Sequence, residues 1–377
     1  MTKNSFFTQK IINWYPQNKR DLPWRDTQNP YKIWLSEIIL QQTRVVQGMP
    51  YYEKFIKTFP TVQELATADE QTVLRLWQGL GYYSRARNLH AAAKYISEEL
   101  NGIFPTNYIE IKKLKGVGDY TAAAISSFAF DEIQAVVDGN VYRVLARFFG
   151  IEKDITVAKN QKEFREIAQK LISKKEPAIY NQAIMEFGAL QCVPKKPKCQ
   201  TCPLQKKCIA FDKNLIEKLP LKGKKTIVKD RFMHYFVFTK VENNEKKVLI
   251  KQRKKGDIWQ GLNDFFVIEF MNKDKKKFEP IKELKNYLKD NNFEIVSDKI
   301  KLKSVHESII FKHQLSHRTL YAKFYTIEIN DTKEENELWK KLKKNYNLEE
   351  INWQNLDKIP KPVLISKYLD YLGAHLF

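Results

Sequence analysis

Four cysteines lie close together in the chain and constrain its fold more than any other feature. They are separated by six, two and five residues, and the sequence has no other cysteine. Thiolates at such short spacing can close around one soft metal centre, and the prolines between them help the chain to turn. The spacing leaves both Zn²⁺ and an iron–sulfur cluster open. The sequence therefore predicts a small metal-stapled module, with the ligands Cys192, Cys199, Cys202 and Cys208.

The chain carries an excess of positive charge. Its 377 residues include 65 Lys and Arg against 44 Asp and Glu, a formal net charge of +21. This balance favours a polyanionic partner, nucleic acid first and an anionic membrane surface second, although a general abundance of lysine contributes to it. Residues 195–229, beside the cysteines, hold 11 lysines against two acidic residues.

The N-terminus lacks the apolar core of a signal peptide, and the longest apolar helical pattern is too short to cross a bilayer. We therefore expect a cytoplasmic protein with no membrane partner. Its thiols would be reduced, which argues against a disulfide framework and for a metal centre.

Hydrophobic periodicity predicts two different halves. A helical pattern extends to about residue 211, and Thr61 with Glu64 and Thr67 with Glu70 resemble capping boxes. From Arg231 onward the period changes to the alternation of a strand. The predicted fold is a mainly α first half followed by a smaller α+β domain. The expected parts are a helical region at 1–211, a basic linker at 212–229 and a second domain at 230–377.

Individual elements can also be placed. The expected helices of the first half span residues 30–46, 84–100, 106–114, 120–130, 139–149 and 177–190. In the second half we expect strands from 231 and at 320–329, and helices near 281–288 and 363–372.

A glycine-containing turn is expected between two short helices at residues 114–122, Leu-Lys-Gly-Val-Gly-Asp-Tyr-Thr-Ala. Gly116 and Gly118 flank Val117 and permit a tight turn. The exposed N–H groups at the start of the next helix can hold an anion such as a DNA phosphate. A Gly-x-Gly sequence between helices is, on its own, more often only a turn.

Two carboxyl groups, Asp138 and Glu37, are candidate catalytic groups. Asp138 precedes a helix and is expected to be its N-cap, where N–H donors and the helix dipole would lower its pKa. Glu37 lies within an apolar helical run, where burial would raise its pKa towards 7. The alternatives are that Asp138 is only a cap and that Glu37 lies on an exposed polar face. Together the pair would suit a neutral acid and a charged carboxylate beside a developing cation.

Several motifs occur in one order. They are residues 34–45 (Trp-Leu-Ser-Glu-Ile-Ile-Leu-Gln-Gln-Thr-Arg-Val), the turn at 114–122, residues 136–147 (Val-Val-Asp-Gly-Asn-Val-Tyr-Arg-Val-Leu-Ala-Arg) and the four cysteines. This combination resembles the helix-hairpin-helix DNA glycosylases that carry a [4Fe–4S] cluster, and within them the adenine-specific branch. The resemblance implies a monomeric, nucleoid-associated repair enzyme. Its substrate would be double-stranded DNA in which adenine is mispaired with 8-oxoguanine or guanine.

The resemblance also implies catalytic roles. Glu37 would protonate the flipped adenine at N7, and ionised Asp138 would stabilise an oxocarbenium-like sugar while water completes the hydrolysis. Tyr120 would orient these groups. It stands where endonuclease III-like enzymes carry a lysine that forms a Schiff base, so strand cleavage by that route is not expected.

Further site residues follow from the same resemblance. Gln42 and Tyr82 are expected to probe the duplex around the extruded base and the 8-oxoguanine. Four residues fall where the family lines its adenine pocket or one helical turn beyond it: Arg20, Trp24, Gln182 and Glu186. Each of these four also has a plain interpretation as a packing or surface residue.

The second half resembles the Nudix-like domain with which this branch recognises 8-oxoguanine. The matching segments are residues 259–262, 313–318 and 359–363. In the family, a residue equivalent to Ser316 contacts the oxidised base and His317 supports its loop. Leu315 replaces a frequent Phe, and residues 263–266 depart from the usual sequence. Because no glutamate-rich metal-binding motif is present, we expect no nucleotide pyrophosphatase activity.

Two rival hypotheses remain at this stage. One is a bifunctional, endonuclease III-like lyase. The other is a noncatalytic, metal-stapled DNA-binding module.

Overall fold

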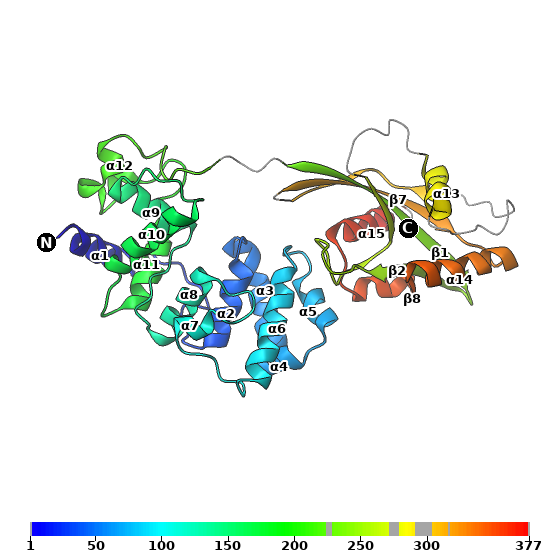
Figure 1. Cartoon of the computed structure of the whole chain (residues 1–377), viewed down its shortest axis with the longest axis horizontal. Coiled ribbons are helices and arrows are strands. Elements are labelled where there is room, and N and C mark those ends of the chain that lie inside the picture. The colour runs from blue at the N-terminus through cyan, green and yellow to red at the C-terminus, as the bar shows by residue number, and fades with distance from the viewer. Residues whose placement is uncertain (1, 224–227, 271–278, 291–303, 316, 376–377) are drawn as a thin grey trace. The chain divides into compact units, whose positions relative to one another are not determined.

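The computed structural model describes residues 2–223, 228–270, 279–290, 304–315 and 317–375 (Figure 1). The chain forms two compact units, Met1–Ala68 with Arg87–Lys225 and Asp69–Ala86 with Thr226–Phe377. The second unit thus includes a helix from the first half of the sequence. The three-part division expected from the sequence remains a prediction. No helix among the described residues is long and apolar enough to cross a membrane.

The first half of the sequence is helical, as predicted. Its helices are α1 (Lys3–Trp14), α2 (Pro30–Leu40), α3 (Val45–Thr58), α4 (Val62–Thr67), α5 (Glu70–Trp77), α6 (Ser84–Glu98), α7 (Tyr108–Ile111), α8 (Asp119–Phe130), α9 (Gly139–Phe149), α10 (Ala158–Leu171), α11 (Pro177–Leu190) and α12 (Ile209–Asp212). Short 3-10 helices, η1 (Cys199–Thr201) and η2 (Gln205–Lys207), lie among the cysteines. The expected bounds of α9 and α11 are confirmed, whereas the helix expected at 106–114 is reduced to α7.

Helix α2 ends earlier than the sequence predicts. Asn29 caps its first turn, as expected, by accepting from the backbone N–H groups of Tyr31 and Lys32. The helix expected to continue to residue 46 stops at Leu40, because the backbone at Gln42 adopts a left-handed conformation with φ +55°. The break separates α2 from α3 and creates an exposed loop.

One of the two predicted capping boxes forms. Thr61 and Glu64 bond each other's backbone N–H groups at the start of α4. The box expected for Thr67 is wrong, because Thr67 is the last residue of α4 and Asp69 caps α5 by accepting from the N–H of Thr72. A better acceptor two residues further along determines where α5 begins.

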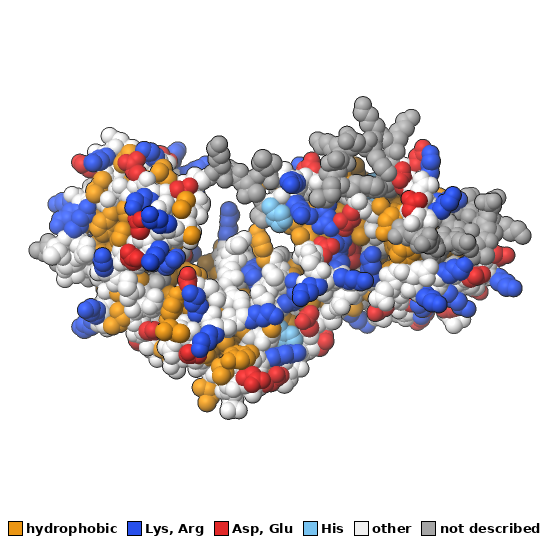
Figure 2. All heavy atoms as spheres, in the orientation of Figure 1, with side chains coloured by type: hydrophobic (Ala, Val, Ile, Leu, Met, Phe, Trp, Pro, Cys, Tyr) orange, Lys and Arg blue, Asp and Glu red, His pale blue; other side chains and the backbone are white. Residues whose placement is uncertain are grey.

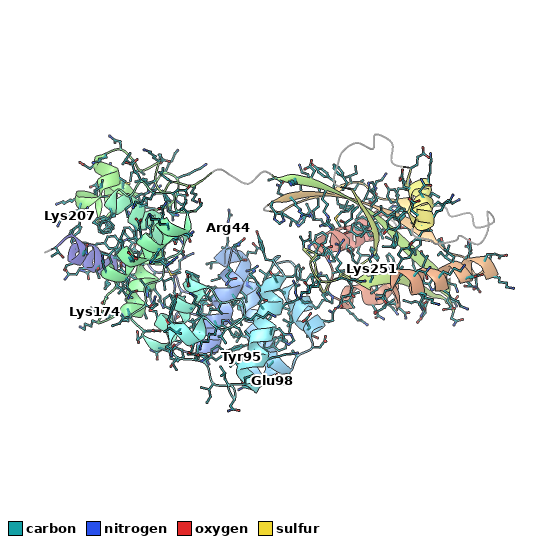
Figure 3. All side chains as sticks on the ribbon, viewed as in Figure 1. Arg44, Tyr95, Glu98, Lys174, Lys207 and Lys251 are labelled. Atoms are coloured by element: carbon teal, nitrogen blue, oxygen red, sulfur yellow. The ribbon has the colours of Figure 1, made fainter. Side chains whose placement is uncertain are left out.

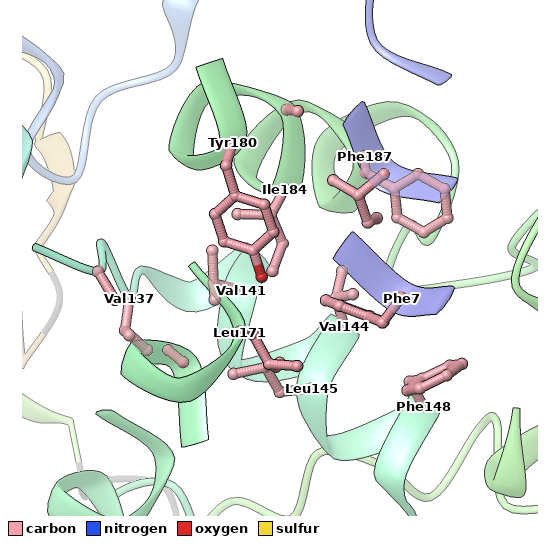
Figure 4. Close-up of a cluster of buried hydrophobic side chains, with 14 of the residues drawn as sticks. Phe7, Val137, Val141, Val144, Leu145, Phe148, Leu171, Tyr180, Ile184 and Phe187 are labelled. Atoms are coloured by element: carbon pink, nitrogen blue, oxygen red, sulfur yellow. The ribbon is translucent and has the colours of Figure 1, made fainter. Parts of the chain in front are cut away.

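Buried side chains from α1, α9, α10 and α11 form a core cluster of the first unit (Figure 4). Phe7 contacts Phe148 with ring centroids 4.8 Å apart, and Leu171 and Phe187 are buried in the same cluster. The half-buried cysteines at 192, 202 and 208 pack against its edge. The cysteine segment is therefore attached to the same core that supports α9.

The second unit is built on a mixed sheet with helices, which confirms the α+β prediction. Its strands among the described residues are β1 (Lys229–Glu242), β2 (Glu245–Gln252), β3 (Asn263–Asp264), β4 (Phe266–Phe270), β5 (Ser304–Glu307), β6 (Phe311–Gln314), β7 (Arg318–Glu328) and β8 (Glu349–Asn352). Its helices besides α5 are α13 (Pro280–Asp290), α14 (Lys333–Tyr346) and α15 (Val363–His375), with a 3-10 helix η3 (Trp353–Lys358).

The strand order is β3-β2-β1-β7-β5, with β4 paired to β1, β6 to β7 and β8 to β2. The long strands β1 and β7 run parallel, in a register that pairs Phe236 with Tyr325, and the other pairs are antiparallel. Apolar side chains of the sheet pack with Leu284 of α13 and Trp339 of α14. Helix α14 was not predicted from the sequence.

Candidate active site

A cavity of about 180 Å³ lies in the first unit, lined by the segment before α2 and by α2, α8, α9 and α11. Its lining is Arg20, Leu22, Trp24, Arg25, Ile33, Ser36, Glu37, Leu40, Thr43, Val45, Tyr120, Phe128, Asp138, Asn140, Gln182, Met185, Glu186 and Ala189. The three residues predicted to be catalytic and the four predicted to line an adenine pocket are therefore brought together. The cavity is of the size that admits a small aromatic ring, since engineered cavities of ~150 Å³ bind benzene.

Glu37 lies on α2 with only 6% of its surface exposed, so the alternative of an exposed polar position is wrong. Burial raises the pKa of Glu37 to about 7, and the nearby charge of Asp138 adds to the rise. A hydrogen bond from Tyr120 and the charge of Arg25 act in the opposite direction. This carboxyl can therefore hold or release a proton near neutral pH.

Tyr120 is the second residue of α8. Its phenol donates a hydrogen bond to Glu37, and burial raises the pKa of Tyr120 well above its ordinary value. The phenol thus remains a hydrogen-bond donor at neutral pH. It joins α8 to α2 at the cavity wall.

Asp138 is the N-cap of α9, as the sequence predicts. Its Oδ1 accepts from the backbone N–H of Asn140 at 2.9 Å and of Val141 at 2.7 Å, and its Oδ2 accepts from Asn140 Nδ2 at 2.7 Å. The expectation that capping lowers its pKa is wrong. Burial raises the pKa of Asp138, and the hydrogen bonds from Val141 and Asn140 only oppose that rise.

Sequence reasoning missed the support behind Asp138. Asn140, which bonds Asp138 with its amide N–H, accepts from Arg143 Nη2 at 2.9 Å. Arg143 also donates to the carbonyl of Gly188 at 2.6 Å and, through Nε, to the carbonyl of Cys192 at 2.7 Å. A continuous hydrogen-bonded chain therefore runs from the candidate carboxylate to the first cysteine. The sequence signal was the spacing of Asn140 and Arg143, which are three residues, about one helical turn, apart.

Glu186 forms the anionic side of the cavity, with 1% of its surface exposed. Arg20 donates to it through Nε at 2.8 Å and Nη2 at 2.7 Å, and Arg25 donates through Nη2 at 2.6 Å. Burial opposes ionisation, but these hydrogen bonds lower the pKa of Glu186 to about 2. Arg20 was predicted as a site residue, whereas Arg25, whose one sequence signal is its place next to Trp24, was not.

Two further predicted residues complete the wall. Gln182 accepts a hydrogen bond from the hydroxyl of Tyr15 at 2.7 Å through Oε1. Trp24 is buried and packs edge-on against Tyr52, with centroids 5.0 Å apart. An aromatic surface and an amide therefore border the cavity beside the Arg–Glu cluster.

The glycine turn lies outside this cavity lining. Gly116 has φ +83°, and a Cβ there would lie 2.7 Å from Asn88 Cβ, so glycine is required. Val117 is buried, and Gly118 is the N-cap of α8 without a side-chain cap. The first backbone N–H groups of α8 therefore have no acceptor within the helix, as an anion site requires.

Gln42 and Tyr82 also lie outside the cavity lining, each on a loop of its own unit. Both are exposed and both have left-handed backbones, with φ +55° and +48°. Such conformations cost energy in non-glycine residues and concentrate at functional sites. In the loop of Gln42, the side chain of Arg44 extends away from the helices (Figure 3).

Two of the residues of interest in the second domain can be described, His317 and Leu315. Ser316 lies outside the described residues. His317 is exposed in the connection between β6 and β7, where its carbonyl accepts from the N–H of Lys229 at 3.2 Å. Leu315, one of the departures from the family pattern, donates its N–H to the carbonyl of Arg318 at 2.7 Å and so tightens this turn.

All four cysteines are free and partly buried. Buried Arg147 supports their segment by donating to the carbonyls of Val193 at 2.8 Å and Pro194 at 2.9 Å, and to Cys192 Sγ at 3.5 Å. Burial raises the pKa of Cys202 to about 12, and the other three thiols contribute because they lie near it. Across the described ranges, however, no three His, Cys, Asp or Glu side chains surround a position for a single metal ion.

The cysteine segment carries several lysines, and Lys207 is exposed with its ammonium 4.6 Å from the centroid of the Phe6 ring. On the face shown in Figure 2, Lys and Arg side chains are spread over both units with acidic groups between them. The net charge of +21 is therefore displayed at the surface. The basic cysteine segment adds a surface that suits a phosphate backbone.

Comparisons with known proteins agree with this arrangement. Residues 35–174 match the model of the HhH-GPD superfamily of base excision DNA repair proteins, and residues 237–371 match a NUDIX domain. An adenine DNA glycosylase of Buchnera aphidicola (subsp. Acyrthosiphon pisum) is 34% identical over 100% of both chains. The human adenine DNA glycosylase is 41% identical over 58% of this chain and 41% of its own length.

A solved structure of a thermostable thymine-DNA glycosylase is also similar. It has a TM-score of 0.52 and 31% identity, over 56% of this chain and 97% of the other.

Proposed function

This chain belongs to the adenine DNA glycosylase family, and on that premise we propose that it hydrolyses the N-glycosidic bond of adenine mispaired with 8-oxoguanine or guanine. One observation carries the proposal. Glu37, with a pKa of about 7, and Asp138, held by three N–H groups, line the same cavity. An acid and an anion at one site are what departure of a purine from a sugar requires.

Glu37 is the proposed general acid. Protonation of adenine at N7 would make the base a better leaving group, and an acid with a pKa near the working pH is best suited to give up its proton. Tyr120 orients the carboxyl through its hydrogen bond. We expect the loss of this acid to slow adenine release by about 10²- to 10⁴-fold.

Asp138 is the proposed stabiliser of the sugar cation. Its three N–H donors stabilise the carboxylate form and fix its direction. Their geometry is set before substrate arrives, because two of them belong to the first turn of α9. Positive charge that develops on the sugar would therefore meet an anion already in place.

The flipped base would lie among Trp24, Gln182 and the Arg20–Glu186 pair. An aromatic surface packs against a base, and the amide and charged groups can bond its polar edge. The ionised Glu186 and Arg20 satisfy each other, so this wall is rigid. Rigid, pre-paired groups select a base by shape and by the hydrogen bonds it offers.

The rest of the duplex would be held by elements outside the cavity. The N–H groups at Gly116–Gly118 suit a phosphate, and Gln42 and Tyr82 suit probing of the opened stack. The proposed partner is double-stranded DNA with an A:8-oxoguanine or A:G pair, bound by a monomer. His317 and Ser316 are proposed to recognise 8-oxoguanine.

We further propose that the four cysteines hold a [4Fe–4S] cluster. The other three thiols lie near enough to Cys202 to raise its pKa, yet the cysteines in the described part of the chain are not grouped around a single ion. This spacing fits a cluster of several atoms better than a lone Zn²⁺ ion. The bound cluster would supply a covalent staple for the segment that Arg143 and Arg147 attach to α9.

Single-turnover cleavage tests the proposal, with duplexes carrying each mismatch and with and without alkali. Wild-type chain should release adenine from A:8-oxoguanine and A:G, and strands should break only after alkali. Asp138→Asn should abolish release, which excludes a noncatalytic DNA-binding module. Borohydride trapping of a covalent adduct by the wild type would favour the lyase instead, and full activity of Glu37→Gln would refute the acid assignment.

A further inference from the structure

We propose that Gln71 and Gln78, near the two ends of α5, position the Tyr82 loop (residues 78–83) by hydrogen-bonding to the Nudix-like domain. The inference makes them positioning residues for recognition of the opposite base. It rests on the proposed function, because the role of Tyr82 is taken from it. The contacts that carry it all lie within the second unit.

Gln71 uses both ends of its amide. Nε2 donates to the carbonyl of Gly261 at 3.0 Å, and Oε1 accepts from Asn263 Nδ2 at 3.1 Å. Gly261 has φ +82°, and a Cβ at this position would lie 3.2 Å from Leu74 Cδ1. The domain backbone therefore approaches α5 closely, and a two-pronged hydrogen bond fixes the approach.

Gln78, at the C-cap of α5, repeats the arrangement. Nε2 donates to Ser366 Oγ at 3.2 Å, and Oε1 accepts from the backbone N–H of Lys361 at 3.2 Å. Together the two glutamines bond α5 to the β3 strand and to the start of α15. Two contacts about 10 Å apart along a helix prevent its rotation, since seven residues span that distance.

The Tyr82 loop that follows is rigid and strained. Gly79, Gly81 and Tyr82 all have positive φ, at +102°, +73° and +48°. Trp77 Nε1 donates to the carbonyl of Gly81 at 3.0 Å, and the guanidinium of Arg85 lies 5.6 Å from the Tyr82 ring centroid. A loop with so little freedom moves with the helix that precedes it.

Through these hydrogen bonds the C-terminal domain would influence recognition of the mismatch by positioning the Tyr82 loop, in addition to any direct contact with DNA. Helix α5 belongs by sequence to the segment that matches the base excision repair model, yet both of its glutamines are bonded to residues of the NUDIX match. Interactions of this kind are polar and directional, so they specify position more than they add stability. Loss of these hydrogen bonds should therefore reduce the preference for A:8-oxoguanine over A:G without unfolding the chain.

The full chain tests this inference through the variants Gln71→Ala and Gln71→Ala/Gln78→Ala, with Thr72→Ala as the matched control. Thr72 is the next residue of α5 and is exposed. The single variant should fold, because Gly261 also accepts from Gln252 Nε2 and Asn263 also donates to Pro360. The first measurement is the ratio of single-turnover rates on A:8-oxoguanine and A:G duplexes.

We expect the double substitution to reduce this ratio about fivefold, because each lost hydrogen bond carries a small free energy. Thr72→Ala should leave it unchanged, and in a Tyr82→Ser background the glutamine substitutions should have no further effect. An unchanged ratio overturns the inference. So does a reduction of equal size in the Tyr82→Ser background, since the glutamines would then act by another route.

Hydrogen exchange separates failure of the inference from failure of the proposed function. The N–H groups of Leu80 and Arg85, which bond the carbonyls of Trp77 and Tyr82, should exchange about tenfold faster in the double variant than in wild type or Thr72→Ala. Equal exchange in all three overturns the inference. If the wild type releases no adenine while exchange changes as expected, the proposed function fails and the positioning contacts remain.

Discussion

At the scale of single residues, two carboxyl groups on one cavity differ in the donors around them. Asp138 accepts from three N–H groups, whereas the hydrogen bond identified for Glu37 comes from a phenol. Burial raises the pKa of both. Glu37 is buried and Asp138 is half-buried, and the N–H donors further distinguish the proposed anion from the proposed acid.

Replacement of Glu37 by Gln should stabilise the protein at about pH 8 but not at pH 5. Because the folded-state pKa is about 7, against an ordinary 4.5, ionisation of Glu37 costs the fold about 3 kcal/mol at high pH. The contribution of Glu37 to the stability of the wild type is therefore fully present below pH 4.5. It is lost as the pH rises to about 7. Glutamine has no such titration and can still accept from Tyr120.

Thermal or urea unfolding at the two pH values measures this effect. Equal differences between variant and wild type at both values would contradict the raised pKa. Asp21→Asn, a change at another carboxyl of the first unit, is the control for loss of one negative charge.

Tyr120→Phe should move the basic limb of the pH–rate profile, where the rate falls as Glu37 loses its proton, to higher pH. The phenol's hydrogen bond stabilises ionised Glu37 and so lowers its pKa, and removing it leaves burial less opposed. Glu37 would then keep its proton to a higher pH. Single-turnover release of adenine measured from pH 6 to 9 gives the inflection, and a shift to lower pH would contradict the assigned direction.

The sequence identified the candidate carboxyl groups of the cavity but not their surroundings. The N-cap role of Asp138 follows from its place before Gly139, yet nothing local shows how deeply it is buried, so the predicted direction of its pKa was wrong. Arg25 was missed because its partner Glu186 is 161 residues away, and their contact forms only when the chain folds. Asn140 was missed although its partner Asp138 is only two residues away.

At the scale of elements, α9 and α11 cross closely where Asn140 bonds Asp138. A Cβ on Gly188 of α11 would lie 2.6 Å from Asn140 Cβ and 3.0 Å from its carbonyl oxygen. These atoms belong to the helix that presents Asp138, so they cannot move without moving the carboxylate. The glycine is therefore part of the geometry of the site.

Gly188→Ala should lower both stability and the rate of adenine release. Alanine normally favours a helix over glycine by about 1 kcal/mol, so a net loss would show that the clash is larger than this gain. Gly139→Ala is the stability control, since a Cβ there meets nothing within 4 Å. Unfolding and single-turnover rates report the two effects, and a stabilised, fully active Gly188→Ala would disprove the close contact.

Element boundaries show where local sequence is decisive. Helix α9 has a strong cap at Asp138 and ends at Gly150 with φ +65°, so both ends were predicted. The break after Leu40 has no proline or glycine to mark it, because the left-handed residue is Gln42. Local propensity does not mark that break, and the expected longer helix was wrong.

At the scale of the whole molecule, the chain combines two architectures that different physical patterns encode. Helical periodicity and capping predicted the first, and alternation in β1 and β7 predicted the second. The assignment of α5 to the second unit could not be predicted, because it depends on hydrogen bonds of Gln71 and Gln78 to residues about 190 and 280 positions away. Such contacts leave no periodic signal.

The charge of the molecule makes a final prediction about salt. With a net charge of +21 and lysines on the cysteine segment, binding to undamaged duplex should be largely a release of counterions. We expect its affinity to fall at least tenfold between ~50 and ~200 mM salt, while the single-turnover rate at saturating protein changes little. Of the proposed catalytic pair, Glu37 is buried and Asp138 is half-buried in the cavity, so both are screened less than surface charges. Titration of a labelled duplex at several salt concentrations gives the slope, and Lys207→Ala should reduce it while Lys282→Ala, on α13 of the other unit, serves as the matched control. An affinity independent of salt would mean that the lysine excess does not act on DNA.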